Sequence, residues 1–140
     1  MLRITRDAFR AMTHEAVVGY PLEACGLISG PEIGTTSDVA TRFHRCTNVA
    51  ASARIYTLDP REHLAIERGI EQQGDEILGV VHSHTHSEPY PSPTDVAQAP
   101  DPAWHYIIIS LKRAAPEVRS YRIIDGTIIE EPIVLIDDGA

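Results

Sequence analysis

Apolar and polar positions show two periodicities along this chain, and the first, the spacing of a helical turn, predicts helices. From about Arg6 to Gly19, apolar residues recur at helical spacing, and Thr5 stands where an N-cap residue belongs. The apolar stripe consists of Ala8, Phe9, Met12, Ala16 and Val17. We therefore expect a first helix that packs this stripe against a core.

Two later segments carry the signals of helix ends. In DPREHLAIERGIEQQG, Asp59 is placed as an N-cap, Pro60 opens the helix, Glu62 stands at capping-box spacing and Gly74 ends it. A short helix should run from Pro93 to about Ala99, where further prolines stop it. Both predictions rest on local capping chemistry.

The second periodicity, strict alternation of apolar and polar residues, predicts strands, as does a short continuous apolar run. We expect strands in ACGLISG, DVATRFHRC, RIYTL, ILGVVHSH and HYIIISL, and a loop in PEIGTTS. VRSYRII and TIIEEPIVLI should form a hairpin about Asp125-Gly126, a favoured turn dipeptide. Helices interleave with strands early and strands pair late, which indicates an α/β sandwich around a mixed sheet.

Composition and net charge limit the classes of protein to which this chain can belong. The 140 residues suit a single domain, residues 1–140, with 43% hydrophobic and 23% charged positions. Twelve Lys and Arg residues against 20 Asp and Glu give a net charge of -8, which argues against nucleic acid as a partner. The first residues lack a signal-peptide core, and no segment has the length of a membrane span. We expect a cytoplasmic protein with Cys25 and Cys46 as reduced, buried thiols.

One stretch, HSHTHSEPYPSPTD, gathers residues with the chemistry of a metal site. Alternate residues of a strand face the same side, so His82 and His84 present two imidazoles together. Asp95 falls in the first turn of the next helix, where the helix dipole favours its ionised form. Two imidazoles and one carboxylate are a normal catalytic zinc set that leaves the fourth position to water. The plain alternative is a helix cap, in which Ser92 and Asp95 form a capping box.

Two further residues could complete a hydrolytic site. Ser92 stands at the mouth of the helix that carries Asp95, and its hydroxyl could donate to an oxyanion. Glu23, in PLEACGLISG, lies between the first helix and a buried strand, and apolar surroundings would raise its pKa toward that of a proton shuttle. We therefore take Glu23 as the candidate base and Ser92 as the candidate oxyanion donor.

Glu23, His82-Ser83-His84, seven residues and then Ser92-Pro93-Thr94-Asp95 resemble the signature of the JAMM, or MPN, metalloproteases. The likeness extends from about Ile4 to Ile136, and EACG, YPSPTDV, HYIIIS and RSYRIIDG resemble small actinobacterial members. It implies a single-domain α-β-α sandwich, related in architecture to cytidine deaminases, with His82, His84 and Asp95 binding one Zn²⁺ per chain. One departure is Thr85, which stands where the family usually has proline.

The resemblance also bears on two residues near the site. Strand alternation would place His86 beside the two histidines, but the family pattern gives the third ligand position to Asp95. His86 is therefore expected to face solvent or substrate. Cys25 shares a face with Glu23 and could reach the metal, but the family pattern makes it core packing.

The function implied by the resemblance is hydrolysis of the peptide bond after the Gly-Gly tail of a ubiquitin-like sulfur carrier protein. The product released is cysteine, as in a route of cysteine biosynthesis. An isopeptidase or deubiquitinase-like enzyme acting on another ubiquitin-like conjugate is one alternative, and a non-catalytic binding module is another. A zinc deaminase needs His-x-Glu followed by Pro-Cys-x-x-Cys, and it is excluded because neither Cys25 nor Cys46 has that context. The sequence carries no signal for an oligomeric state or for a particular carrier.

Overall fold

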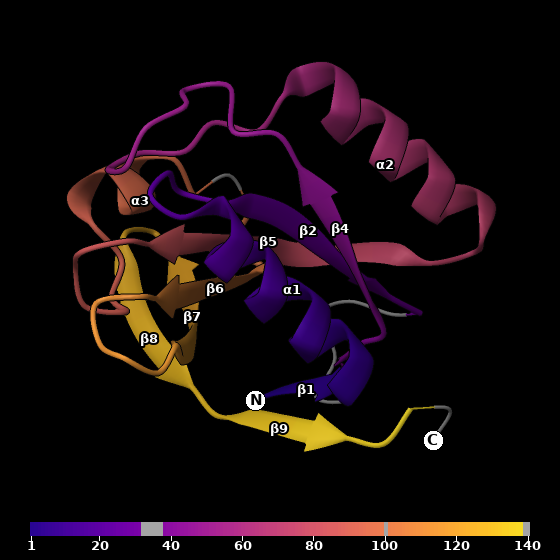
Figure 1. Cartoon of the computed structure of the whole chain (residues 1–140). Helices are drawn as coiled ribbons and strands as arrows, with labels where there is room; N and C mark the ends of the chain where they lie inside the picture. The colour runs from indigo at the N-terminus through magenta and orange to yellow at the C-terminus, as the bar shows by residue number, and fades with distance from the viewer. Residues whose placement is uncertain (32–37, 100, 139–140) are drawn as a thin grey trace.

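The computed structural model describes residues 1–31, 38–99 and 101–138, which form two sheets and three helices (Figure 1). Their bounds, in chain order, are β1 Leu2–Thr5, α1 Arg6–Gly19, β2 Cys25–Gly30, β3 Val39–Ala40, β4 Arg42–Cys46, α2 Pro60–Gln72, β5 Glu76–His84, α3 Pro93–Ala97, β6 His105–Ser110, β7 Glu117–Ile124, β8 Thr127–Glu131 and β9 Ile133–Ile136. None of these helices combines the length and the apolar character needed to cross a membrane.

The larger sheet is mixed, as predicted. Its six strands lie in the order β4-β2-β5-β6-β7-β8, with β5 and β6 parallel and the other neighbours antiparallel. A smaller sheet, in the order β3-β1-β9, is parallel throughout. The strand that ends in the histidines, β5, therefore lies inside the larger sheet.

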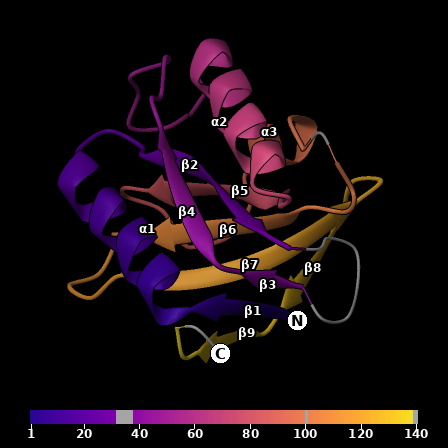
Figure 2. The same ribbon diagram turned by 90° about the vertical axis from the view of Figure 1, so that its right-hand side faces the viewer.

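Helices cover both faces of the larger sheet (Figures 1 and 2). On one face, α1 and the smaller sheet bury a core of Leu2, Ile4, Ala8, Met12, Ala16, Ile28, Ala40, Leu78, Val81, Ile107 and Ile109. On the other, α2, α3 and the segment before α2 cover Leu27, Val80, Tyr106, Ile108, Tyr121 and Ile123. Neighbouring strand residues point to opposite cores because side chains alternate. The predicted α/β sandwich is confirmed.

Capping residues begin the helices where the sequence indicates. Thr5 accepts a hydrogen bond from the Ala8 N–H at 3.3 Å, and Asp59 accepts one from the Arg61 N–H at 2.8 Å. Glu62 does not close the predicted capping box, because its carboxylate accepts from the backbone N–H and the hydroxyl of Thr47. The α2 helix ends at Gln72, and Gly74 follows with a φ of 77° that suits glycine.

Several strand predictions are wrong in ways that long-range pairing explains. The segment 38–46 is divided between two sheets, because β3 pairs with β1 while β4 pairs with β2. Residues 54–58, RIYTL, form no strand and contribute a single bridge from Leu58 to Asn48. The last predicted strand is also divided: β8 completes the hairpin with β7, and β9 joins β1.

Smaller differences concern the helices and the N-terminus. Val17, which the apolar stripe predicts to be buried, is 52% exposed, whereas Ala8, Met12 and Ala16 are buried. The α3 helix ends at Ala97, two residues earlier than expected. The strand β1 has no counterpart among the predictions. The predicted loop at 31–37 lies, apart from Pro31, outside the described residues.

Candidate metal centre

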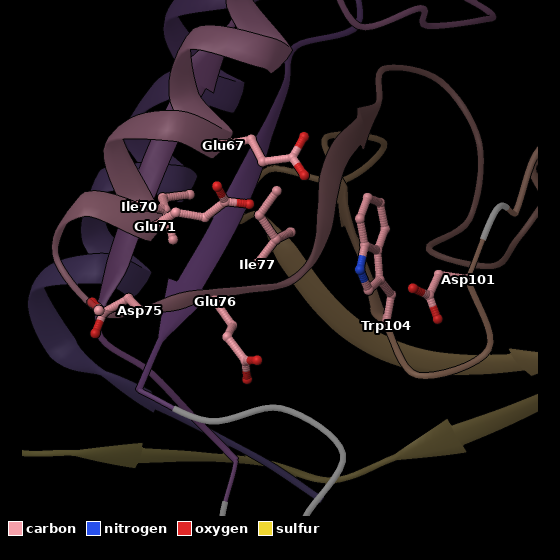
Figure 3. Close-up of a pocket in the computed structure, with 9 residues that line it drawn as sticks. Glu67, Ile70, Glu71, Asp75, Glu76, Ile77, Asp101 and Trp104 are labelled. Atoms are coloured by element: carbon pink, nitrogen blue, oxygen red, sulfur yellow. The ribbon is translucent and has the colours of Figure 1, made fainter.

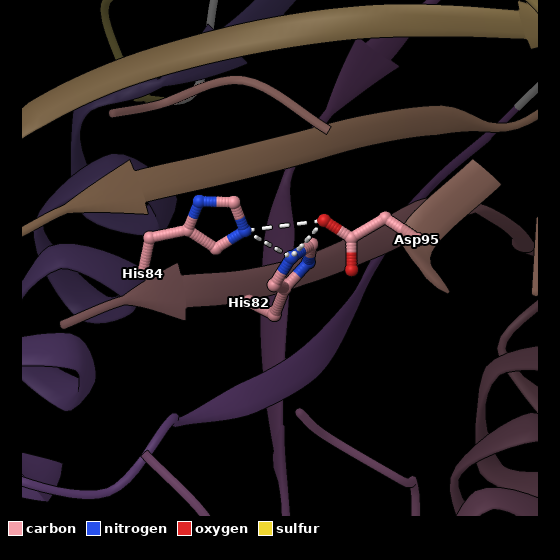
Figure 4. Close-up of side chains that lie close together, drawn as sticks. All are labelled: His82, His84 and Asp95. Atoms are coloured by element: carbon pink, nitrogen blue, oxygen red, sulfur yellow. Dashed lines mark hydrogen bonds and ion pairs between the residues drawn. The ribbon is translucent and has the colours of Figure 1, made fainter. Parts of the chain in front are cut away.

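Three side chains from β5 and α3 converge on one point (Figure 4). The Nε2 atoms of His82 and His84 lie 3.1 Å apart. The Oδ2 atom of Asp95 lies 3.2 Å from the first and 3.1 Å from the second. These three atoms make the only such group of potential metal ligands within the described ranges.

The separations in this triangle match a zinc ligand set. Zinc bonds to histidine nitrogen and carboxylate oxygen at about 2.0–2.2 Å with tetrahedral geometry, so two ligand atoms should lie roughly 3.3–3.6 Å apart. The observed separations of 3.1–3.2 Å are slightly shorter than this spacing. The three residues therefore fit one face of a tetrahedron.

Hydrogen bonding fixes the ring of His84 in the form that a metal requires. Its Nδ1–H donates to the Glu88 carbonyl oxygen at 2.8 Å, so in the neutral ring the Nε2 atom carries a lone pair. That lone pair faces the Asp95 carboxylate, which is itself an acceptor. Two acceptors at this distance repel each other unless a positive charge lies between them.

The charge balance of the cluster favours a cation. Burial would raise the pKa of Asp95, but the imidazoles of His82 and His84 beside it hold the pKa well below its usual range. Burial would lower the pKa of His84, but the nearby Asp95 carboxylate and the hydrogen bond to the Glu88 carbonyl raise it above the usual value. Burial lowers the pKa of His82, so this ring is neutral near pH 7 and suited to ligation.

The N-terminus of α3 orients the Asp95 carboxylate. The Ser92 N–H donates to Asp95 Oδ2 at 2.9 Å, and the Asp95 N–H donates to Ser92 Oγ at 3.0 Å, which completes a capping box. The Oδ2 atom held in this way is the one that faces both imidazoles. Capping and metal ligation therefore use the same carboxylate and do not exclude each other.

Glu23 occupies a buried position beside this cluster. The Glu23 side chain is only 4% exposed, and hydrogen bonds hold its backbone on both sides. The Glu23 N–H donates to the Ser52 carbonyl at 2.8 Å, and Asn48 Nδ2 donates to the Glu23 carbonyl at 3.1 Å. Burial raises the pKa of its carboxyl to about 7, against an opposing effect of His84. A carboxyl with this pKa can take up and release a proton at neutral pH.

A cleft joins these groups. Its volume is about 550 Å³, and it is lined by Glu23, Ala53, Arg54, His84, His86, Ser87 and Ser92. The candidate base, one candidate ligand and the candidate oxyanion donor thus border the same space. This cleft is called the site cleft below.

Two residues that sequence analysis weighed as extra ligands lie outside the triangle. His86 is exposed, and its ring hydrogen-bonds to Tyr20 and Thr85. Cys25 is buried beside Cys46 across the β2–β4 pair, and its thiol donates to the Cys46 carbonyl at 3.4 Å. Burial raises the pKa of the Cys25 thiol to about 12, so it stays protonated and packs as a small apolar group.

Sequence reasoning missed two contacts that shape the site. Tyr56 stacks on the ring of His82, with centroids 4.2 Å apart and planes 20° apart. Thr85 donates its hydroxyl hydrogen to the Ala53 carbonyl at 2.9 Å, which ties the end of β5 to the segment over the cleft. The departure from proline at position 85 signalled the second contact, but nothing in RIYTL signalled the first.

A second cavity of about 550 Å³ lies against α2, and none of the three candidate ligands borders it (Figure 3). Five carboxylates and Trp104 line it, the acidic residues being Glu67, Glu71, Asp75, Glu76 and Asp101. No imidazole borders it, and its carboxylates belong to no convergent group of potential metal ligands within the described residues. It is separate from the site cleft.

Known proteins share both the sequence and the fold of this chain. A model of prokaryotic homologues of the JAB domain matches residues 5–124. The CysO-cysteine peptidase of Mycobacterium tuberculosis is 39% identical over 98% of this chain and 92% of its own length. The desampylase of Haloferax volcanii is 39% identical over 75% of each chain. A solution structure of a Desulfitobacterium hafniense protein superposes with a TM-score of 0.85 at 32% identity, covering 99% of this chain and 94% of the other. The resemblance to the JAMM, or MPN, proteins is thereby confirmed, and the chain belongs to the prokaryotic branch of the JAB domain family.

Proposed function

We propose that this protein is a zinc-dependent metallopeptidase that cleaves the peptide bond after the Gly-Gly tail of a ubiquitin-like sulfur carrier protein and releases cysteine. The observation that carries the proposal is the triangle of His82, His84 and Asp95 at zinc-ligand spacing, with Glu23 and Ser92 on the same cleft. Family membership and the peptidase relative support it.

In this proposal His82, His84 and Asp95 hold one Zn²⁺. Zinc in such a set lowers the pKa of water toward neutrality and so supplies a nucleophile near pH 7. The chain itself keeps the ligands in order: Glu88 sets the ring of His84, and the capping box sets the carboxylate of Asp95.

The reaction adds one water molecule across the scissile amide. The water oxygen bonds to the glycine carbonyl carbon, the C–N bond breaks, and the products are a glycine carboxylate and an ammonium group that has received both water protons. Glu23 takes the proton from water and passes it to the departing nitrogen, a role that its pKa of about 7 suits. Ser92 Oγ accepts the Asp95 N–H, so its own hydrogen is available to donate to the carbonyl oxygen as negative charge develops there.

The substrate assignment rests on the relatives. An extended diglycine fits a narrow cleft where larger side chains would clash, and the mycobacterial relative is a CysO-cysteine peptidase. Release of cysteine from such a carrier would place the enzyme in cysteine biosynthesis. The desampylase relative favours a second candidate function, hydrolysis of an isopeptide bond to another ubiquitin-like conjugate.

The first experiment is to measure the intact mass of a Gly-Gly-ending sulfur carrier from the same genome, extended by one cysteine. It is incubated with the protein with and without a chelator. Loss of one cysteine that the chelator prevents is the expected result. An unchanged mass with zinc bound, together with cleavage of a lysine-linked conjugate, would favour the second function. No cleavage of either would indicate a binding module.

A further inference from the structure

One permanently charged cationic residue, Arg54, lines the site cleft. The other side chains that line it are carboxylate, imidazole, hydroxyl or methyl groups. Within the described part of the chain, no carboxylate forms an ion pair with Arg54, whereas Arg6, Arg10, Arg45, Arg113 and Arg119 each have one. The charge of Arg54 is therefore open to a ligand in the cleft.

Hydrogen bonds tie the backbone at Arg54 to the candidate machinery. The Arg54 N–H donates to Ser52 Oγ at 3.0 Å, and the carbonyl of Ser52 accepts the N–H of Glu23 at 2.8 Å. From the other side, the Thr85 hydroxyl donates to the carbonyl of Ala53 at 2.9 Å. The segment that carries Arg54 is thus anchored both to the segment of the base and to the strand of the histidines.

Thr85 holds this anchor through a directional network. Its single hydroxyl hydrogen is donated to Ala53, so the contact of 2.8 Å to His86 requires His86 Nδ1 to be the donor. In the neutral ring, His86 Nε2 then accepts from the Tyr20 hydroxyl at 3.3 Å. A proline at position 85 has no hydroxyl and could not make either of the first two contacts.

The two candidate leaving groups, cysteine and lysine, differ in whether a carboxylate lies close to the nitrogen of the scissile bond. When cysteine leaves, its nitrogen is bonded to a Cα that bears a free carboxylate, and the carboxyl carbon lies about 2.5 Å from that nitrogen. When lysine leaves an isopeptide bond, its nitrogen stands on a flexible hydrocarbon stem with no carboxylate attached. A residue that binds the carboxylate must therefore border the cleft of the base, as Arg54 does.

We propose that Arg54 binds the α-carboxylate of the departing amino acid and so selects a single C-terminal residue over an internal or isopeptide-linked leaving group. This assignment rests on the proposed peptidase function and adds its specificity. Thr85 acts as a positioning residue, because it holds the segment of Arg54 over the cleft. Guanidinium pairs with carboxylate through two parallel hydrogen bonds, which lysine cannot reproduce.

The test compares two carrier substrates that differ only at the end, one terminating in cysteine and the other in cysteine amide. The zinc-loaded protein should cleave the acid with a kcat/KM roughly 10- to 100-fold above the amide, the effect of a hydrogen-bonded charge pair. In Arg54→Gln this ratio should fall toward one, and in Arg54→Lys it should be intermediate. The matched control is Arg68→Gln, an exposed arginine on α2 outside the cleft, which should keep the wild-type ratio.

Thr85 is tested by the same ratio. In Thr85→Val the preference for the acid should shrink through a higher KM for that substrate, and in Thr85→Ser, which keeps the hydroxyl, it should return. Equal cleavage of acid and amide by the wild-type protein would overturn the role of Arg54 and leave the peptidase function standing. A preference that survives Arg54→Gln would do the same. Failure to cleave either substrate with zinc bound would overturn the peptidase function and this inference together.

Discussion

Two buried clusters of histidine and carboxylate lie on opposite faces of the larger sheet. The first consists of the three candidate ligands His82, His84 and Asp95 and is called the metal cluster for that reason; the rings of its histidines share a face with Val80. The ion-pair cluster is Asp38, His105 and Glu131, and its ring shares the other face with Ile107. The same residue types occur in both, but their donors and acceptors are arranged differently.

In the ion-pair cluster each ring nitrogen has its own carboxylate. His105 Nδ1 lies 2.6 Å from Glu131 Oε2, and Nε2 lies 2.8 Å from Asp38 Oδ2. Ser120 donates to the same Glu131 oxygen at 2.8 Å. In this cluster each imidazole nitrogen therefore faces a carboxylate oxygen of its own, so nitrogens and acceptors are matched in pairs.

In the metal cluster the acceptors outnumber the donors at the point where they meet. Two imidazole nitrogens and one carboxylate oxygen converge within 3.2 Å, and the hydrogen of His84 is already donated elsewhere, to Glu88. The direction of the lone pairs, rather than the presence of His and Asp, makes one cluster a candidate metal site and the other a buried ion pair.

The largest effect is expected when a ring of the metal cluster is removed. His84→Ala should lower zinc affinity by more than about 100-fold and reduce peptidase activity to background, since two protein ligands remain. Zinc content by elemental analysis and the carrier cleavage assay measure both. His86→Ala, which removes a nearby ring outside the triangle, should keep its zinc. Wild-type zinc occupancy in His84→Ala would contradict the ligand assignment.

A smaller loss is expected when the base alone is changed. Glu23→Gln keeps the shape of the side chain but cannot carry a proton, so kcat should fall by about 10²- to 10⁴-fold while zinc remains bound. The comparison of interest is zinc content against kcat in the same preparation. Full activity in Glu23→Gln would end the proposed role of Glu23 as base.

The ion-pair cluster should respond in stability and not in zinc content. His105→Asn leaves two buried carboxylates without their shared partner, which is expected to lower the free energy of unfolding by about 3–5 kcal/mol. Denaturant unfolding measures the change, and zinc content serves as the control. A variant that lost its zinc while its stability stayed at the wild-type level would reverse the roles of the two clusters.

The smallest effect concerns pH. Burial would raise the pKa of Glu131, but hydrogen bonds from His105 and Ser120 lower it below its usual value. A carboxyl whose pKa is lower in the folded state stabilises the fold above its unfolded pKa, and this stability is lost as the pH falls through the folded pKa. The stability difference between the wild type and Glu131→Gln should therefore be largest near neutrality and shrink below about pH 4.5.

The neighbouring residue provides the control for that titration. Glu130 is half-exposed on the same strand and pairs with Arg119 at the surface. Exposed pairs contribute little, so Glu130→Gln should stay within about 1 kcal/mol of the wild type at every pH. A difference as large as that of Glu131→Gln would show that burial is not the deciding factor.

Local rules account for what the sequence determined by itself. The capping of α1 by Thr5, the capping box of Ser92 and Asp95, and the shared face of His82 and His84 depend on residues within a few positions of one another. Backbone geometry alone brings such residues together, because a helix turn and a strand pleat have fixed periods. The metal cluster and its helix cap could therefore be predicted. Glu23 was proposed from its apolar setting and from the family resemblance, because no local rule places it beside the histidines.

Only the tertiary structure decided the contacts that join distant segments. Alternation in residues 38–46 predicts a strand but does not predict that β3 pairs within the smaller sheet while β4 pairs within the larger one. Strand pairing depends on packing against neighbours that can come from anywhere in the chain. The same holds for β9 beside β1, for Tyr56 stacked on His82, and for the ion-pair cluster built from three segments. Burial then sets the chemistry, since it is the packing around Glu23 that raises its pKa to about 7. Packing also brings Arg54 to the cleft of that base.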